Sequence, residues 1–192
     1  MSEKMSPVKP SSLSSLPSER HRFTTILSFE SLDSTNDYIK SNLDAYDDGT
    51  VVVASYQTQG RGQFERTWES QPGMNLLCSI LFKNQLDPLC LSEITVRAIR
   101  QTLADYGVSS WFKNPNDIYA DEYKIAGLLI ETKYTLGVRT SVVLGIGLNV
   151  NQQYFETTTA TSILLQTGKG LDRLDVLERL LCHLENELET CE

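Results

Sequence analysis

Short runs of apolar and β-branched residues alternate with polar segments along this chain, and such runs are typical of strands. They occupy residues 24–29, 50–55, 75–82, 110–113, 125–132 and 141–150. The last two are expected to form a hairpin that turns near 135–137, and Pro115 is expected to end the strand at 110–113. Between the strands, the polar segment 57–71 contains two close glycines, which predicts a long loop.

Two other segments repeat apolar residues at helical spacing. The first contains Leu91, Ile94, Ala98, Ile99 and Leu103 and is expected to end at Gly107. The second contains Leu177, Leu180, Leu181, Leu184 and Leu188, and Asp172 or Asp175 can cap its start. A shorter helix is expected to begin at Ser34, with Asp37 as the capping partner. Strand pairs with separated helices predict an α+β fold, in which helices back one mixed or antiparallel sheet.

The first residues differ in composition from the rest of the chain. Residues 1–22 are rich in Ser and Pro and show no periodicity, so we expect a flexible tail. Residues 23–192 are then expected to form one domain.

The charge balance and a few residue counts exclude several function classes. A net charge of −8 argues against nonspecific binding to nucleic acid or to an anionic membrane. No apolar run reaches the roughly 20 residues of a transmembrane helix, and the start of the chain does not resemble a signal peptide. The 4 cysteines form no CxxC pair, which indicates reduced and mostly core thiols in a cytoplasmic protein. Only 2 histidines are present, which disfavours a histidine metal site or a Ser-His-Asp triad.

The first candidate site motif is Gly60-Arg61-Gly62, followed by Arg66 and Trp68 in the predicted loop. Glycines let backbone N–H groups approach an anion, and arginine forks onto a carboxylate or phosphate. A solvated turn with two surface arginines is an equally open interpretation of this pattern alone.

The second motif runs from Lys113 to Asp117 and is followed by Lys124 and Gly127. Lys113 stands at the end of a strand, and Asn116 and Asp117 are expected on the turn beside it. A lysine in that setting suits a phosphate or carboxylate ligand. A plain β-turn explains the same residues, and taken alone it is the better interpretation.

Two shorter motifs, 145–149 and 34–36, complete the set. Gly145, Gly147 and Asn149 could bring backbone and an amide close to a ligand, or form a tight bend with a capping Asn. Ser-Thr-Asn at a helix start could bind a small polar group, or act simply as an N-cap.

Together and in this order, the four motifs resemble those of the catalytic domain of biotin–protein ligases. That family carries Ser-Thr-Asn, Gly-Arg-Gly with a following Arg and Trp, Lys-Trp-Pro-Asn-Asp, Lys-x-x-Gly-Ile-Leu-x-Glu and Gly-x-Gly-x-Asn. The corresponding stretches here are 34–36, 60–68, 113–117, 124–131 and 145–149, and the resemblance covers roughly residue 29 to the C-terminus.

The resemblance implies that the protein, with a class II aminoacyl-tRNA-synthetase-like domain, would activate biotin with ATP and Mg²⁺. The resulting biotinyl-AMP would then modify a lysine of a biotin carboxyl carrier protein. Biotin would contact Ser34, Thr35, Asn36, Gln57, Gly60, Arg61, Gly62, Lys113, Lys124 and Gly127. ATP would contact Arg61, Arg66, Trp68, Asn116 and Asn149, with Mg²⁺ near Asn149. The catalytic set would be Lys113, Arg61, Lys124 and Asp117.

This chemistry agrees with the scarcity of histidine. A carboxylate oxygen attacks the α-phosphorus, and the acceptor amine then attacks the mixed anhydride. Neither step needs a nucleophile from the enzyme, but both need positioning and neutralisation of oxyanion charge, which Arg and Lys supply.

Three positions depart from the family's pattern. Gln63 stands where relatives commonly have a basic residue, Glu65 where they have glycine, and Asn114 where they have tryptophan. Two alternatives therefore stay open: a lipoate–protein ligase or octanoyl transferase of the same fold, and a relative that binds biotin or nucleotide without turnover. By analogy with the family, a homodimer is a further expectation. Some relatives carry a helix-turn-helix domain or a C-terminal β-barrel domain, and neither is expected here.

Overall fold

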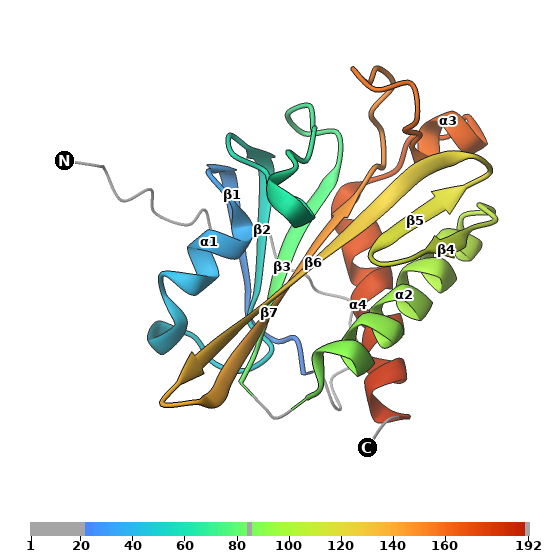
Figure 1. Ribbon diagram of the computed structural model, residues 1–192. Coiled ribbons are helices and arrows are strands. Elements are labelled where there is room, and N and C mark those ends of the chain that lie inside the picture. Colours follow the sequence, from blue (N-terminus) through green and yellow to red (C-terminus); the bar gives the residue numbers. More distant parts are fainter. Residues whose placement is uncertain (1–21, 84–85, 191–192) are drawn as a thin grey trace.

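The computed structural model describes residues 22–83 and 86–190, so the tail expected at 1–22 lies outside the described residues except for Arg22. One mixed sheet forms the centre of the molecule, and helices lie on both of its faces (Figure 1). The strands are β1 (Ile26–Leu32), β2 (Val51–Gln57), β3 (Leu76–Phe82), β4 (Trp111–Lys113), β5 (Asp117–Ala120), β6 (Tyr123–Thr135) and β7 (Val138–Leu148). The helices are α1 (Thr35–Lys40), α2 (Pro88–Asp105), α3 (Ile163–Thr167) and α4 (Arg173–Glu189).

The strand order is β1-β2-β3-β7-β6-β5-β4 in the described residues. Only β1 and β2 pair in parallel, and every other neighbouring pair is antiparallel. The long β6–β7 hairpin turns at Leu136 and Gly137, both at positive φ, where the sequence predicted a turn. The α+β class with a mixed sheet is therefore confirmed.

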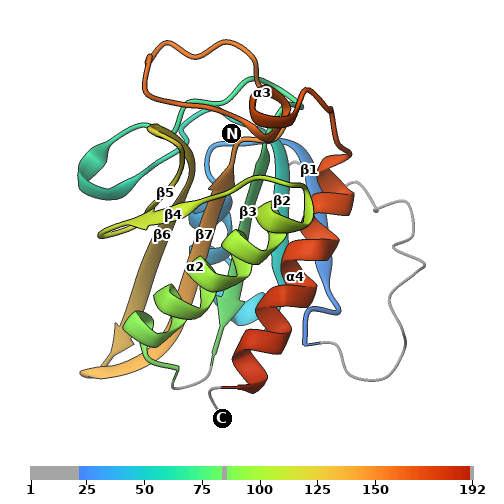
Figure 2. The same ribbon diagram turned by 90° about the vertical axis from the view of Figure 1, so that its right-hand side faces the viewer.

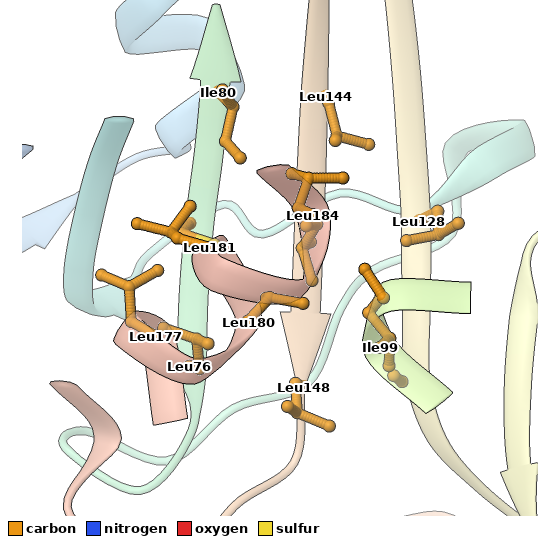
Figure 3. Close-up of a cluster of buried hydrophobic side chains, with 14 of the residues drawn as sticks. Leu76, Ile80, Ile99, Leu128, Leu144, Leu148, Leu177, Leu180, Leu181 and Leu184 are labelled. Atoms are coloured by element: carbon orange, nitrogen blue, oxygen red, sulfur yellow. The ribbon is translucent and has the colours of Figure 1, made fainter. Parts of the chain in front are cut away.

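The main core lies between the sheet and helices α2 and α4, which cover one face side by side (Figure 2). Both helices begin at an aspartate N-cap, Asp87 and Asp172, whose carboxylates accept bonds from first-turn N–H groups. The predicted leucines of α4 point at the sheet, where Leu180 and Leu184 meet side chains of β3 and β7 (Figure 3). Apolar burial at helical spacing thus attaches α4 to the sheet, as its pattern predicted.

Truncating a core leucine should lower stability strongly. Leu180 is fully buried (0% exposed), so Leu180→Ala removes apolar contacts and leaves a cavity. We expect a loss of about 2–5 kcal/mol in the free energy of unfolding, measured by urea denaturation. Leu165→Ala is the control, because that leucine is 50% exposed, and its effect should stay within about 0.5 kcal/mol. A similar loss in both variants would contradict this view of the core.

The opposite face of the sheet is covered less completely. The six-residue helix α1 packs a smaller cluster there, in which Ile39 and Leu43 meet Phe29, Leu81 and Val143. This helix packs against β2, β3 and part of β7. The rest of that face, over β6 and the remainder of β7, is left for a pocket.

Two predictions about local structure were wrong or incomplete. Asp117 was expected on a turn after Pro115, but it begins strand β5, which pairs with both β4 and β6. Four residues are too few for a clear alternation, so the turn signal of the preceding Asn-Pro-Asn dominated. Helix α3 was not expected at all, since it has only five residues.

The cysteines are only partly as predicted. Cys78, Cys90 and Cys182 form no disulfide, and Cys191 lies outside the described residues. Only Cys78 is a core thiol, while Cys90 is half-buried and Cys182 is exposed. In the described part of the chain, no helix is long and apolar enough to cross a bilayer.

Candidate active site

A pocket opens on the α1 side of the sheet. Most of the residues predicted for the site line it: Ser34, Thr35, Asn36, Gln57, Arg61, Gly62, Arg66, Trp68, Asn116, Asp117, Lys124 and Gly127. The space between them, including the part open to solvent, is about 700 Å³. Pockets of roughly 300–1,000 Å³ are typical of small-molecule sites. The tertiary structure therefore gathers segments from Ser34 to Gly147 into one site.

The floor of the pocket is built from backbone. Cys78, Leu128 and Ile146 line it, but their side chains belong to the core that faces α2 and α4. Burial raises the pKa of Cys78 to about 12, so its thiol stays protonated and is no nucleophile at neutral pH. None of these three was among the predicted site residues, because they belong to ordinary apolar strands.

One end of the pocket is a network of uncharged polar groups at the start of α1. Ser34 is the N-cap, and its Oγ accepts a bond from the Asp37 N–H (3.4 Å). The backbone N–H and Oγ1 of Thr35 both donate to Gln57 Oε1, at 2.8 and 3.0 Å. Ser34 is thus a helix N-cap, and the same Ser-Thr-Asn segment also lines the pocket. The two interpretations of this motif are therefore compatible.

Ser79 is a part of this network that sequence reasoning missed. Its fully buried Oγ lies 2.6 Å from Thr35 Oγ1 and 2.5 Å from Asn36 Oδ1, and its single proton can serve one of them at a time. Ser79 is the one hydroxyl residue in the apolar strand β3, and that was the only signal in the sequence.

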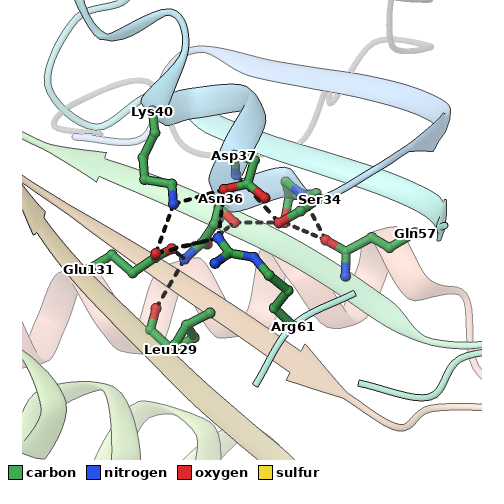
Figure 4. A network of polar contacts seen from close by, with 10 residues as sticks. Ser34, Asn36, Asp37, Lys40, Gln57, Arg61, Leu129 and Glu131 are labelled. Carbon is green, nitrogen blue, oxygen red and sulfur yellow. Dashed lines mark hydrogen bonds and ion pairs between the residues drawn. The ribbon is translucent and has the colours of Figure 1, made fainter. Parts of the chain in front are cut away.

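Beside this end lie four charged side chains, Asp37, Lys40, Arg61 and Glu131, which we call the ionic cluster (Figure 4). Arg61 Nη2 lies 2.6 Å from Asp37 Oδ1 and 3.3 Å from Glu131 Oε2. Lys40 Nζ lies 2.8 Å from one oxygen of each carboxylate. Asn36 Nδ2 donates to Glu131 Oε2 (2.8 Å) and to the Leu129 carbonyl (3.3 Å). The ionic cluster therefore connects α1, β6 and the loop through Arg61.

The ionic cluster also sets the charge of Glu131. Burial alone would raise the pKa of this carboxyl, but hydrogen bonds from Lys40 and Asn36 and the charges of Lys40 and Arg61 outweigh it and lower the pKa. Glu131 is therefore charged at neutral pH. The contribution of these contacts to stability is present at neutral pH and is lost only as the pH falls through that lowered pKa.

Three glycines let bulky groups lie directly against the sheet. A Cβ at Gly147 would stand 2.5 Å from the Trp68 ring, and one at Gly127 would stand 2.9 Å from it. A Cβ at Gly145 would stand 2.4 Å from Asn36 Oδ1. The glycines of the 145–149 motif thus leave the space that the side chains of Asn36 and Trp68 occupy. Neither interpretation of this motif from the sequence had included that role.

The other end of the pocket carries a lysine. Lys124 Nζ, on β6, lies 2.6 Å from Asp117 Oδ1 and 5.3 Å from the centre of the Trp68 ring. Asn116 exchanges bonds with Leu128, which hold the start of β5 against β6. Lys124, Asp117 and Trp68 therefore form one contact group at this end.

Three predicted residues lie outside the pocket lining: Gly60, Lys113 and Asn149. Gly60 lies against Trp68 within the same loop, and its carbonyl accepts a hydrogen bond from the Trp68 N–H (2.9 Å). The Lys113 amine lies 4.6 Å from the centre of the Tyr119 ring, on the exposed edge strand β4. Asn149 is buried just after β7 and its Nδ2 donates to the Thr161 carbonyl (2.9 Å).

The comparisons with known proteins agree with one another. Residues 28–151 match the biotin/lipoate A/B protein ligase family. The chain is 33% identical over 147 residues to the bifunctional ligase/repressor BirA of Bacillus spizizenii, a match that covers 72% of this chain and 45% of that protein. It is 29% identical over 171 residues to the Escherichia coli protein of the same name, covering 84% and 52%. The chain thus spans about half the length of these relatives.

Solved structures show the same similarity. The biotin protein ligase from Aquifex aeolicus in complex with biotin and ATP has a TM-score of 0.76 and 30% identity, and the match covers 87% of this chain and 71% of that one. The biotin protein ligase from Leishmania major in complex with biotinyl-5-AMP has a TM-score of 0.68 and 27% identity, covering 87% and 79%.

Proposed function

This chain belongs to the biotin/lipoate A/B protein ligase family, and we propose that it activates biotin with ATP and transfers it to a lysine of a biotin carboxyl carrier protein. The observation that carries the proposal is the division of the pocket into two ends. A network of uncharged hydrogen-bonding groups occupies one end, and a lysine beside an indole occupies the other. Biotinyl-AMP joins a cyclic urea to a nucleotide through an acid chain. The urea requires uncharged hydrogen-bonding groups, and the nucleotide requires a cation and an aromatic surface.

Biotin's ureido ring suits the polar end. It presents one carbonyl and two N–H groups, and these require both donors and acceptors. Ser34, Thr35, Asn36 and Gln57 supply both kinds of group at the start of α1. Bonds to Gln57, Glu131 and the Leu129 carbonyl hold Thr35 and Asn36, and Ser79 donates to one of them at a time, so these groups are preorganised without the ligand. We therefore propose these four residues, with the backbone of Gly60 and Gly62, as the biotin-binding set.

The nucleotide belongs at the other end in this proposal. Lys124 and Arg66 would neutralise charge on the reacting carboxylate and the α-phosphate. Trp68 presents an indole beside them for the nucleotide, and Asn116 orders the adjoining turn. We propose Lys124, not Lys113, as the principal cation, because Lys113 lies outside the pocket lining.

Mg²⁺ would arrive with ATP. Magnesium ions in such sites typically take one or two protein oxygens and fill their shell with phosphate and water. The buried Asn149 Oδ1 has no hydrogen-bond partner among the described residues, and this residue follows two positions after Gly147 of the pocket lining. The described residues contain no group of three or more His, Cys, Asp or Glu that could hold a metal by themselves. One protein oxygen without a full ligand set fits a metal ion whose other ligands are phosphate oxygens and water. We propose that Asn149 supplies that oxygen.

The chemistry needs only positioning and charge. A biotin carboxylate oxygen forms a bond to the α-phosphorus while pyrophosphate leaves with the electron pair of the broken P–O bond. The neutral amine of the carrier lysine then attacks the acyl carbon, AMP leaves, and the amine loses its proton. Lys124 can stabilise the oxyanion charge in both steps, and closure of the loop 58–75 would keep water from the anhydride.

Lipoate is the second candidate acid, since the family includes lipoate ligases. Its dithiolane ring has no hydrogen-bonding groups that match Thr35, Asn36 and Gln57. Donors and acceptors of the polar end that have no protein partner would be cut off from water by that ring, which typically costs about 1–3 kcal/mol for each group left unpaired. The polar end of the pocket therefore favours biotin.

ATP–pyrophosphate exchange tests the proposal directly. With labelled pyrophosphate, we expect exchange into ATP that depends on biotin and is at least about tenfold slower with lipoate. Exchange supported by lipoate alone would identify a lipoate ligase. Calorimetric binding of biotin without any exchange would identify a relative that binds and does not turn over.

A further inference from the structure

The surroundings of the Asn36 side chain allow only one orientation of its amide. Its Nδ2 donates to Glu131 Oε2 at 2.8 Å and to the Leu129 carbonyl at 3.3 Å (Figure 4). A carboxylate and a carbonyl can only accept, so both amide protons are taken up within the protein. Turning the amide over would set its oxygen against these two acceptors, which is repulsive.

The amide oxygen of Asn36 therefore faces the opposite way, toward β3 and β7. Ser79 Oγ lies 2.5 Å from Asn36 Oδ1, and the absence of a Cβ at Gly145 leaves room for that oxygen. An amide oxygen has two lone pairs and a serine has one proton to give, so a lone pair is left over. Asn36 lines the pocket, and it can meet a ligand there only as a hydrogen-bond acceptor.

Gln57 has the opposite polarity at the same end of the pocket. Its Oε1 accepts from both the backbone N–H and the Oγ1 of Thr35. Its Nε2 has no hydrogen bond to another described residue, so Gln57 can meet a ligand as a donor. The polar end thus offers one fixed acceptor and one fixed donor.

Glu131 has to stay charged to hold Asn36 in this orientation, because a protonated carboxyl could donate to Asn36 Oδ1 and allow the reversed amide. Lys40 Nζ lies 2.8 Å from Glu131 Oε1, which leaves Oε2 for Asn36. Arg61 adds a contact through Nη2 alone, and its Nε and Nη1 donors stay available for a ligand. Lys40 therefore keeps Glu131 paired even when Arg61 turns toward a ligand.

We propose that Glu131 is a positioning residue, which acts through Asn36 and fixes the acceptor that the polar end presents to a ring N–H group of the substrate acid. An acceptor that is already aligned lowers the entropy cost of binding. An acid with N–H groups in its ring is then favoured over an acid whose ring has none. The effect on biotin rests on the proposed function, whereas the orientation of Asn36 does not.

Exchanging the donor and the acceptor of this contact makes a sharp test. Asn36→Asp puts an oxygen in the place of Nδ2, where it would repel the Glu131 carboxylate. Adding Glu131→Gln supplies an amide donor to that oxygen, so the hydrogen bond is restored in the reversed sense. Glu131→Gln alone keeps an acceptor for Nδ2 but loses the charge. The control is Lys133→Gln, which removes an exposed charge two positions along β6.

Isothermal titration with biotin is the deciding measurement. We expect Kd to rise about 50-fold in Asn36→Asp and about threefold in Glu131→Gln, within the range that hydrogen bonds to charged groups span. The double variant should bind at least about fivefold more tightly than Asn36→Asp alone, as coupling between groups in direct contact requires. Lys133→Gln should match the wild type. Additive losses in the double variant, or an unchanged Kd in Asn36→Asp, would overturn the proposal.

Steady-state kinetics separate positioning from a merely structural role. We expect the KM for biotin to rise about threefold in Glu131→Gln, while the KM for ATP and kcat change less than about twofold. A parallel rise in both KM values would mean that Glu131 only supports the fold, and the proposal would be wrong. Urea midpoints measured on each variant verify that it folds.

The orientation of Asn36 can be tested without any substrate. NMR detects its two Nδ2 protons, which are identified by their loss in Asn36→Asp. We expect their exchange with water to rise about fivefold in Glu131→Gln, because a charge-assisted bond becomes a neutral one, and to stay unchanged in Lys133→Gln. Equal exchange in Glu131→Gln and the wild type would contradict the proposal. If the wild-type protein binds no biotin, the proposed function fails, and this measurement still decides the orientation.

Discussion

Lys124→Met should slow the formation of biotinyl-adenylate by a factor of about 100 or more. Methionine keeps most of the apolar stem but removes the charge that lies against Asp117 and Trp68 in the pocket. The negative charge that develops on the α-phosphate and on the biotin carboxylate would then lose its nearest cation. A single-turnover experiment with labelled ATP and saturating biotin measures this rate.

Lys113→Met is the informative comparison for this variant. Its amine packs on Tyr119 at the sheet edge, so we expect a rate loss at least about tenfold smaller than that of Lys124→Met. Equal losses would mean that β4 moves into the site when ligands bind, and that the assignment to Lys124 alone is wrong. Because Lys124→Met also leaves Asp117 without its ion-pair partner, urea denaturation should accompany the kinetics.

Gly145→Ala should weaken biotin binding by roughly 10- to 100-fold, the equivalent of one or two hydrogen bonds. The new methyl would stand 2.4 Å from Asn36 Oδ1 and 3.0 Å from its Cγ, so the buried amide must move. Asn36 would then lose its contacts with Ser79 and Glu131, and the polar end of the pocket would change shape. Isothermal titration with biotin measures the effect on Kd.

A matched glycine provides the control for this substitution. Gly170 has no positive φ, and a Cβ there would meet only Asn151 Oδ1, at an ordinary contact distance of 3.6 Å. Gly170→Ala should therefore bind biotin like the wild type. If Gly145→Ala also keeps the wild-type Kd, Asn36 is not part of the biotin site.

The contacts of Lys113 and Arg61 in the folded chain illustrate what motifs alone could not show. Both were assigned to anion contacts because a cation beside glycine, asparagine or aspartate suits a phosphate. In the folded chain the Lys113 amine lies over a tyrosine ring, and the Arg61 guanidinium lies between two carboxylates. A motif defines which groups are near one another along the chain, but not the direction in which a long side chain points.

The sequence by itself determined the elements that depend on local chemistry. Apolar spacing and a capping aspartate were sufficient for α4, and two apolar, β-branched runs around a glycine turn were sufficient for the β6–β7 hairpin. These features are set by residues a few positions apart, whose periodicity and capping act within one element. The same local signals located the loop and the helix start that line the pocket.

Only the tertiary structure decided which residues share the pocket and what they contact. Asn36 meets Ser79 across 43 positions and Glu131 across 95 positions. The space that Trp68 occupies exists because Gly127 and Gly147 face each other in the register of β6 and β7. Such contacts depend on strand order and register, which follow from packing the whole apolar core against α2 and α4. No segment carries that information alone, because the free energy that selects the register is shared by side chains from every strand.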